Sequence, residues 1–79
     1  MRYFFNIRDS IGLILDEEGS EFSGIAAARQ EAVASARDFA MDDLRSGRVV
    51  HARNIEITDE GGAVLESLAV RDVLVSLRH

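Results

Sequence analysis

The side chains that could bind a metal ion are gathered in one short acidic segment. Asp16, Glu17, Glu18 and Glu21 follow one another closely, and carboxylate oxygens are the ligands that Ca²⁺ and Mg²⁺ prefer. The segment lacks the alternating Asp/Asn ladder and the terminal Glu of an EF-hand loop. We therefore interpret it as a solvated loop in front of a helix, whose dipole favours acidic neighbours. We expect no metal and no cofactor, and a cation at this loop remains the alternative.

Histidine and serine offer little for catalysis. His51 and His79 are the only histidines, and a histidine metal site needs more ligands at useful spacing. None of the serines stands in a Gly-x-Ser-x-Gly nucleophile elbow. A chain of 79 residues also has little room for a pocket that buries a substrate. We expect that the protein is not an enzyme and has no catalytic residues.

Arginine side chains are the remaining candidates for binding. Alternation along a strand places Arg2 and Arg8 on the same face as Phe4. Such a face can hold single-stranded nucleic acid, or it can form the contact of a symmetric dimer. Nine basic residues against fourteen acidic ones give a net charge of −5, which opposes binding to a phosphate backbone. We therefore expect a protein partner and not a nucleic acid.

Length and composition indicate a single small domain over residues 1–79. The hydrophobic fraction of 47% is typical of a globular chain and excludes disorder. The absence of cysteine excludes disulfides and thiolate metal sites. The apolar N-terminal run is interrupted by Asn6, Arg8 and Asp9, so it is neither a signal peptide nor a membrane span. We expect a cytoplasmic protein without a membrane partner.

The first third of the sequence predicts a β-hairpin followed by a loop. Residues 3–7 and 11–15 are apolar runs, and Asp9-Ser10 between them is typical of a turn. Gly12 weakens the second strand. Residues 16–21 contain no apolar side chain, which indicates a loop.

Residues 24–46 predict one long helix, because they contain no proline and are rich in alanine. Ser23 is the expected N-cap, and Gly47 is the expected terminating residue. An apolar stripe at helical spacing runs along this helix and consists of Ile25, Ala28, Ala32, Ala36, Phe39 and Ala40. Arg29 and Asp43 also fall within the apolar stripe, and we expect both side chains to reach past the core into water.

The last third predicts a second hairpin and a short helix. After Val49 and Val50, residues 52–58 alternate as a half-buried strand does. Residues 59–62, Asp-Glu-Gly-Gly, are typical of a hairpin turn, and residues 63–70 form the return strand. Helical spacing of apolar residues in 70–77 predicts a short C-terminal helix.

These elements predict an α+β fold: a four-stranded antiparallel sheet in the order β-β-α-β-β, with one long helix on one face and a short C-terminal helical segment. The reverse face would carry Phe4, Ile14, Leu65 and Ala69, which is unusually apolar for a solvated surface. Either the terminal helix or a second copy of the chain would cover it. We therefore expect a homodimer. The expected contact residues are Phe4, Ile14, Arg2, Arg8, Leu74 and Leu77.

Several segments in order resemble a known family. They are Arg-Tyr-Phe-Phe-Asn-Ile-Arg-Asp at 2–9, Asp-Glu-Glu-Gly at 16–19, the Ala-rich helix, and Ile-Glu-Ile-Thr-Asp-Glu at 55–60. Together they resemble a domain-of-unknown-function family of short proteins from rhizobia-like alphaproteobacteria. That resemblance implies a fold and a lineage but no activity. Family members often have His where this chain has Asn6, which argues against a metal or acid–base role there.

A second likeness concerns the order of the elements alone. HicB-like antitoxins also open with an aromatic strand, pass an acidic turn and enter an Ala/Glu-rich helix. This chain lacks their usual Pro-Gly segment between strands and helix. The likeness implies, as the alternative function, an antitoxin-like regulator that binds a basic protein partner.

Overall fold

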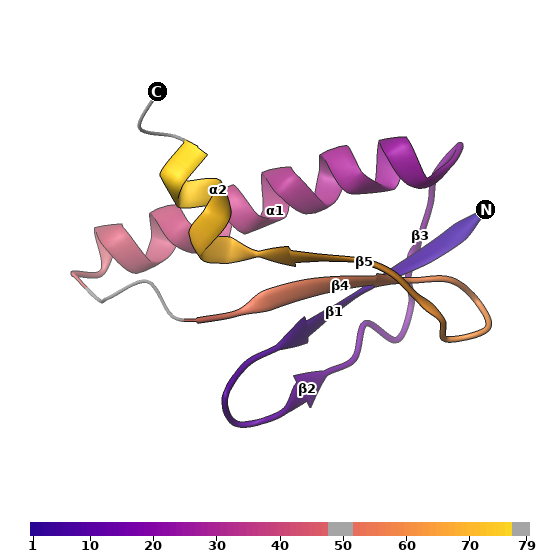
Figure 1. Ribbon diagram of the computed structural model, residues 1–79, viewed down its shortest axis with the longest axis horizontal. Coiled ribbons are helices and arrows are strands. Elements are labelled where there is room, and N and C mark those ends of the chain that lie inside the picture. The colour runs from indigo at the N-terminus through magenta and orange to yellow at the C-terminus, as the bar shows by residue number, and fades with distance from the viewer. Residues whose placement is uncertain (48–51, 77–79) are drawn as a thin grey trace.

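The computed structural model of the protein shows an antiparallel sheet with two helices (Figure 1). It describes residues 1–47 and 52–76. Val49, Val50, His51, Leu77 and His79 lie outside the described residues. The elements are β1 (Arg2–Arg8), β2 (Leu13–Ile14), β3 (Ser20–Glu21), α1 (Ile25–Arg45), β4 (Asn54–Thr58), β5 (Val64–Ala69) and α2 (Val70–Ser76).

The sheet has the strand order β2-β1-β4-β5, and β3 pairs with β1 as well. All pairings are antiparallel. The expected four strands are therefore corrected to five, because the segment predicted as an acidic loop contributes β3. Ser20 and Glu21 pair with the start of β1, whereas β2 pairs with its end. Two short strands thus share the outer edge of one long strand.

The predicted helix and the alanines of its apolar stripe are confirmed, whereas Ile25 of the predicted stripe is 39% exposed. Four alanines of α1 are completely buried against Ile55 and Ile57 of β4 and against Tyr3 of β1. Alanine lets a helix lie close to a sheet, so the volume of the core comes from the strands. The buried alanines are Ala28, Ala32, Ala36 and Ala40.

The predicted helix ends are half right. Gly47 has φ +71° and follows the C-cap Ser46, as the sequence indicated. The N-cap is Gly24 and makes no side-chain capping bond, so the prediction of Ser23 was wrong. The predicted turn at residues 59–62 is confirmed by bonds from the Asp59 N–H to the Ala63 carbonyl and from the Gly62 N–H to the Asp59 carbonyl.

The short helix α2 lies on the same side of the sheet as α1 and packs against it (Figure 1). α2 therefore does not cover the reverse face, and the expectation that the terminal helix would cover it was wrong. Val70, its first residue, is completely buried in the core, and Val73 packs at the margin. Its position leaves the reverse face to the loop that precedes β3.

Candidate interaction site

The outer edge of β1 is held by the side chain of Asp16. One carboxylate oxygen of Asp16 accepts the Phe5 N–H at 3.1 Å, and the other accepts the Gly19 N–H at 3.1 Å. The Asp16 N–H donates to Oδ1 of Asn6 at 2.9 Å. Asp16 thus replaces a strand partner at the point where neither β2 nor β3 pairs with β1. Asp16 is half-buried, while Glu17, Glu18 and Glu21 are exposed. The only half-buried carboxylate of the acidic segment is therefore already bonded to the backbone.

Replacing Asp16 by alanine tests this arrangement. The change leaves the Phe5 and Gly19 N–H groups without their acceptor, whereas the backbone N–H of residue 16 can still donate to Asn6. We expect the free energy of unfolding to fall by about 2 kcal/mol, as for loss of hydrogen bonds to a charged group. Urea denaturation measures it, with Glu17→Ala in the same loop as the control. A loss below 0.5 kcal/mol (about the effect of an ordinary surface change) would show that the Asp16 bonds contribute little.

Large apolar side chains are exposed along β2 and immediately before and after it. The exposed fraction is 94% for Ile11, 63% for Ile14, 62% for Leu15 and 39% for Leu13. Single exposed apolar residues are ordinary, but a contiguous group of them marks an interaction site. We call Ile11, Leu13, Ile14 and Leu15 the apolar tip.

The backbone of the apolar tip is open to pairing as well. The Phe5 N–H points away from β4 toward Asp16, so by alternation Ile7 directs its backbone groups to the same side. Ile7 pairs with Ile14, and the next alternate N–H, that of Asp16, also points back to β1. Leu13 and Leu15 therefore direct their N–H and C=O groups outward. β2 is the end strand of the sheet order, so this edge is free among the described residues.

Phe4 does not share the exposure of the apolar tip. It is half-buried, and the Gly19 backbone lies against its ring, since a Cβ built on Gly19 would come within 2.8 Å of that ring. The rest of the reverse face is polar along β1, β4 and β5. Ile14 pairs directly with Ile7, which packs against the core. Directly paired residues share a face, so the prediction that placed Ile14 on the reverse face was wrong. Leu65 is exposed and Ala69 is half-buried. Besides Arg2 and Arg8, the polar residues of this face are Asn6, Asn54, Glu56, Thr58 and Ser67.

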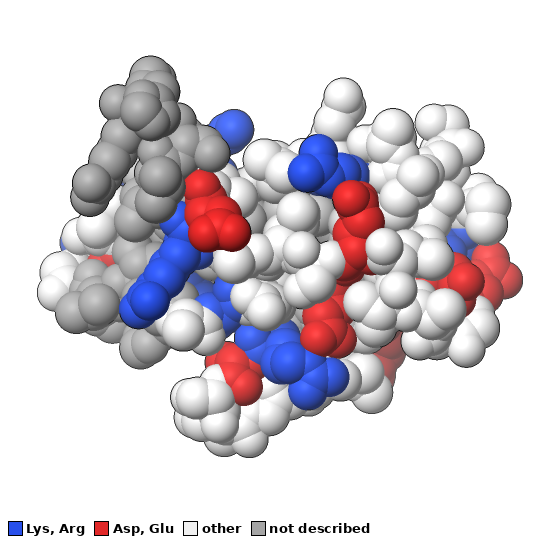
Figure 2. Space-filling view, viewed as in Figure 1, with Lys and Arg blue, Asp and Glu red and all other residues white. Residues whose placement is uncertain are grey.

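Arg2 and Arg8 are both engaged with acidic residues. Arg2 pairs with Glu21 at 3.3 Å and donates to the Glu18 carbonyl. Arg8 binds both carboxylate oxygens of Glu56. The hydrogen bond and the charge of Glu56 raise the pKa of the Arg8 guanidinium. Figure 2 shows blue and red side chains beside one another on the visible face rather than a field of one sign. Such a surface does not favour a phosphate backbone.

The other residues predicted to carry function are only partly placed. The backbone of Leu74 lies in α2, while its side chain and the whole of Leu77 lie outside the described residues. His51 and His79 also lie outside them. Within the described ranges, no three acidic or histidine side chains come together as a metal site would require. Nor does any described helix have the length and apolarity to cross a membrane.

A buried ion pair was missed by the sequence reasoning. Asp43 was expected to reach water, but it is only 2% exposed. Arg53 Nη2 donates to Asp43 Oδ2 at 2.6 Å, and its guanidinium carbon lies 4.9 Å from the Phe39 ring centroid. Asp43 within an apolar stripe was the available signal, because a buried carboxylate needs a cation. The pair joins the end of α1 to the residue that precedes β4.

The comparisons with known proteins concern the same strands and helix. The family described as "Domain of unknown function (DUF6894)" matches residues 2–71. The chain belongs to this family. The DUF6894 match spans β1 to the start of α2 and includes the apolar tip and the Asp43–Arg53 pair. Neither the curated proteins nor the solved structures gave a match.

Proposed function

We propose that this DUF6894 protein is a small interaction protein that self-associates, with two copies meeting along β2. The observation that carries the proposal is the apolar tip on a free strand edge. Ile11, Ile14 and Leu15 are each more than half exposed there. Free backbone groups and exposed apolar side chains on one edge are the two features that strand addition uses.

A second copy suits this edge because the apolar tip is complementary to itself. In a two-fold dimer the same residues face each other, so an antiparallel β2–β2 contact pairs apolar with apolar. Leu13 and Leu15 would exchange backbone hydrogen bonds with their counterparts. The contact would bury the exposed side chains of Ile11 and Ile14. Arg8, Phe4 and Arg2 are not required, because their side chains already have contacts within the chain.

The small size of the apolar tip makes the proposed dimer weak. It involves four large side chains per copy, so the contact falls in the class of interfaces below about 1,200 Å². Each copy carries a net charge of −5, and the two copies repel each other. Added salt screens that repulsion. Dimerisation therefore strengthens as the salt concentration rises, which is opposite to a contact held by ion pairs.

Sedimentation velocity across a dilution series tests the interface. The variant Ile11→Ser/Ile14→Ser removes two side chains of the apolar tip. We expect it to raise the dimer dissociation constant by at least about tenfold, which corresponds to about 1.4 kcal/mol. The matched control is Met41→Ser/Leu44→Ser on α1, whose side chains are 38% and 50% exposed.

The control variant should dimerise like the original chain, because α1 takes no part in the proposed contact. Equal loss in both variants would assign the effect to general hydrophobicity. A chain that sediments as a monomer up to several hundred micromolar, at low and at high salt, would exclude self-association.

An antitoxin-like regulator with a basic protein partner is the second candidate function. It is supported by the net charge of −5 and by the exposed side chains of Glu17 and Glu18 beside β3. Co-purification from the source cell distinguishes it, because the partner would be recovered in equal amounts and would be basic. A cytoplasmic location and an alphaproteobacterial origin are part of the same proposal.

A further inference from the structure

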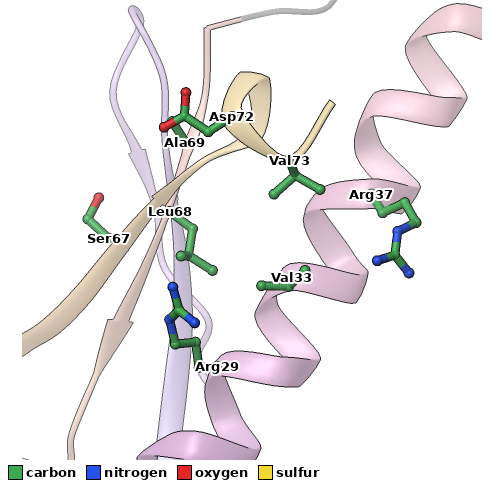
Figure 3. A pocket seen from close by; sticks show the side chains of 8 residues that line it. All are labelled: Arg29, Val33, Arg37, Ser67, Leu68, Ala69, Asp72 and Val73. Atoms are coloured by element: carbon green, nitrogen blue, oxygen red, sulfur yellow. The ribbon is translucent and has the colours of Figure 1, made fainter. Parts of the chain in front are cut away.

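A groove runs between the outer edge of β5 and the helix α1, at the far end of the strand order from the apolar tip (Figure 3). Its volume is about 440 Å³. Its apolar lining comes from Leu68 and Ala69 of β5, Val33 of α1 and Val73 of α2. Arg29 and Arg37 extend from α1, and α2 stands at one end (Figure 3). A second hollow adjoins the same three α1 residues, Arg29, Val33 and Arg37.

The wall formed by β5 presents unpaired backbone. Val70 donates its N–H to the Arg53 carbonyl, on the β4 side. By alternation Leu68 also directs its groups to β4, so Ser67 directs its N–H and C=O away from the sheet. β5 is the last strand in the order, and Ser67 lines the groove. Among the described residues, no bond from another element takes up these groups.

The opposite wall of the groove is α1, where two arginines lie on either side of a valine. Arg29, Val33 and Arg37 follow one another at intervals of one helical turn. Arg29 pairs with Glu66 at 3.1 Å. Arg37 is exposed and has no ion pair with any described residue. Asp72 of α2 is the acidic residue of the lining and has a contact of its own.

We propose that this groove binds an extended peptide segment with the pattern acidic–x–apolar–x–acidic, added as a strand to β5. The eight-residue step from Arg29 to Arg37 rises about 12 Å along a helix, and α1 runs along the strands (Figure 1). A strand covers about 13 Å in four residues, and alternate side chains share a face. One acidic side chain of the peptide reaches Arg37, and the other takes the place of Glu66 at Arg29. The central apolar side chain packs on Val33, Leu68 and Val73.

Fluorescence anisotropy with a labelled heptapeptide tests the proposal. The probe is Thr-Glu-Thr-Val-Thr-Glu-Thr, and the control peptides carry Gln or Lys in place of both Glu residues. We expect the Glu peptide to bind at least about fivefold more tightly than the Gln peptide, because charge-assisted hydrogen bonds are the stronger ones. The Lys peptide should show no saturable binding.

Two pairs of variants locate the site. Ser67→Pro removes the outward N–H that the added strand needs and is compatible with an edge strand, whereas Ser67→Ala retains that N–H. We expect Ser67→Pro to bind the Glu peptide at least about tenfold more weakly, since a main-chain bond is lost. Ser67→Ala should bind it as tightly as the original chain does. Arg37→Gln should weaken the Glu peptide at least about threefold. Arg71→Gln, an exposed arginine outside the groove, should not.

Circular dichroism establishes that each variant is folded, and Arg37→Gln tests the site even if Ser67→Pro is not. Equal binding of the three peptides, or equal effects of Arg37→Gln and Arg71→Gln, would overturn the proposal. If Ser67→Pro abolishes dimerisation instead, β5 is the edge that pairs with a second copy and the peptide groove is excluded. Loss of dimerisation in the β2 variants leaves the peptide result unaffected, so the two proposals fail separately.

Discussion

Replacing Asp43 by alanine is expected to lower the free energy of unfolding by about 3–5 kcal/mol, because it leaves the Arg53 guanidinium without its carboxylate in a site with little water. The Asp43 side chain is 3% exposed and that of Arg53 is 17% exposed. A domain of this length has a free energy of unfolding on the order of 5–10 kcal/mol. Urea denaturation should therefore find the variant close to unfolding at 25 °C.

The neighbouring acidic residue provides the matched control. Asp42 is 72% exposed and lies 4.0 Å from Arg45, so Asp42→Ala should change stability by less than about 0.5 kcal/mol. The double variant Asp43→Leu/Arg53→Met removes both charges and should be more stable than Asp43→Ala. If Asp43→Ala is as stable as Asp42→Ala, the pair contributes nothing and α1 is held to β4 by apolar contacts alone.

Replacing Gly19 by alanine is expected to cause the second large loss in the free energy of unfolding. Gly19 has φ +69°, and an added Cβ would lie 2.8 Å from the Tyr3 carbonyl oxygen and 2.8 Å from the Phe4 ring. The left-handed conformation costs about 1–2 kcal/mol in a residue with a side chain, and displacing backbone adds to that cost. We expect a loss of at least about 3 kcal/mol in urea denaturation.

The variant Gly47→Ala distinguishes the cost of the left-handed conformation from the cost of the close contacts. Gly47 has nearly the same φ, +71°, but a Cβ there meets nothing within 4 Å. Gly47→Ala should therefore cost only the conformational part, about 1 kcal/mol. A Gly19→Ala variant no less stable than Gly47→Ala would mean that the loop before β3 moves aside without cost and does not hold Phe4.

The elements that depend on local periodicity could be predicted from the sequence. The alanine stripe placed α1 on its correct face, and alternation placed Ile55 and Ile57 toward it. The turn at residues 59–62 and the end of α1 at Gly47 follow from residue types with few alternatives. These features need no knowledge of what lies across the core.

The features that depend on distant contacts could not be predicted. β3 forms because Asp16 and Gly19 return the chain to β1, and a two-residue strand has no periodicity to detect. Strict alternation assigned Phe4 to an open face, while the loop that covers it carries no apolar signal. The side of the sheet on which α2 packs depends on α1, which is distant in the sequence.

The candidate site shows the same division. Alternation assigned Ile14 to the reverse face beside Phe4, whereas its pairing with Ile7 places it on the other face. The exposed neighbours Ile11 and Leu15 were not singled out, because an edge strand and a central strand have similar sequences. The polar residues Asn54, Glu56 and Ser67 lie on the reverse face and were visible in the sequence. The prediction of an unusually apolar reverse face was therefore wrong along β4 and β5, because it counted Leu65 and Ala69 and left these polar side chains out.

Amide hydrogen exchange at two protein concentrations tests the central claim, that two copies pair along β2. The N–H groups of Leu13 and Leu15 point outward in one chain, while the Asp16 N–H is bonded to Asn6. Above the dissociation constant, we expect exchange at Leu13 and Leu15 to slow at least about tenfold and exchange at Asp16 to stay the same. A dimer in which Leu13 and Leu15 exchange as fast as in the monomer would contradict pairing along β2.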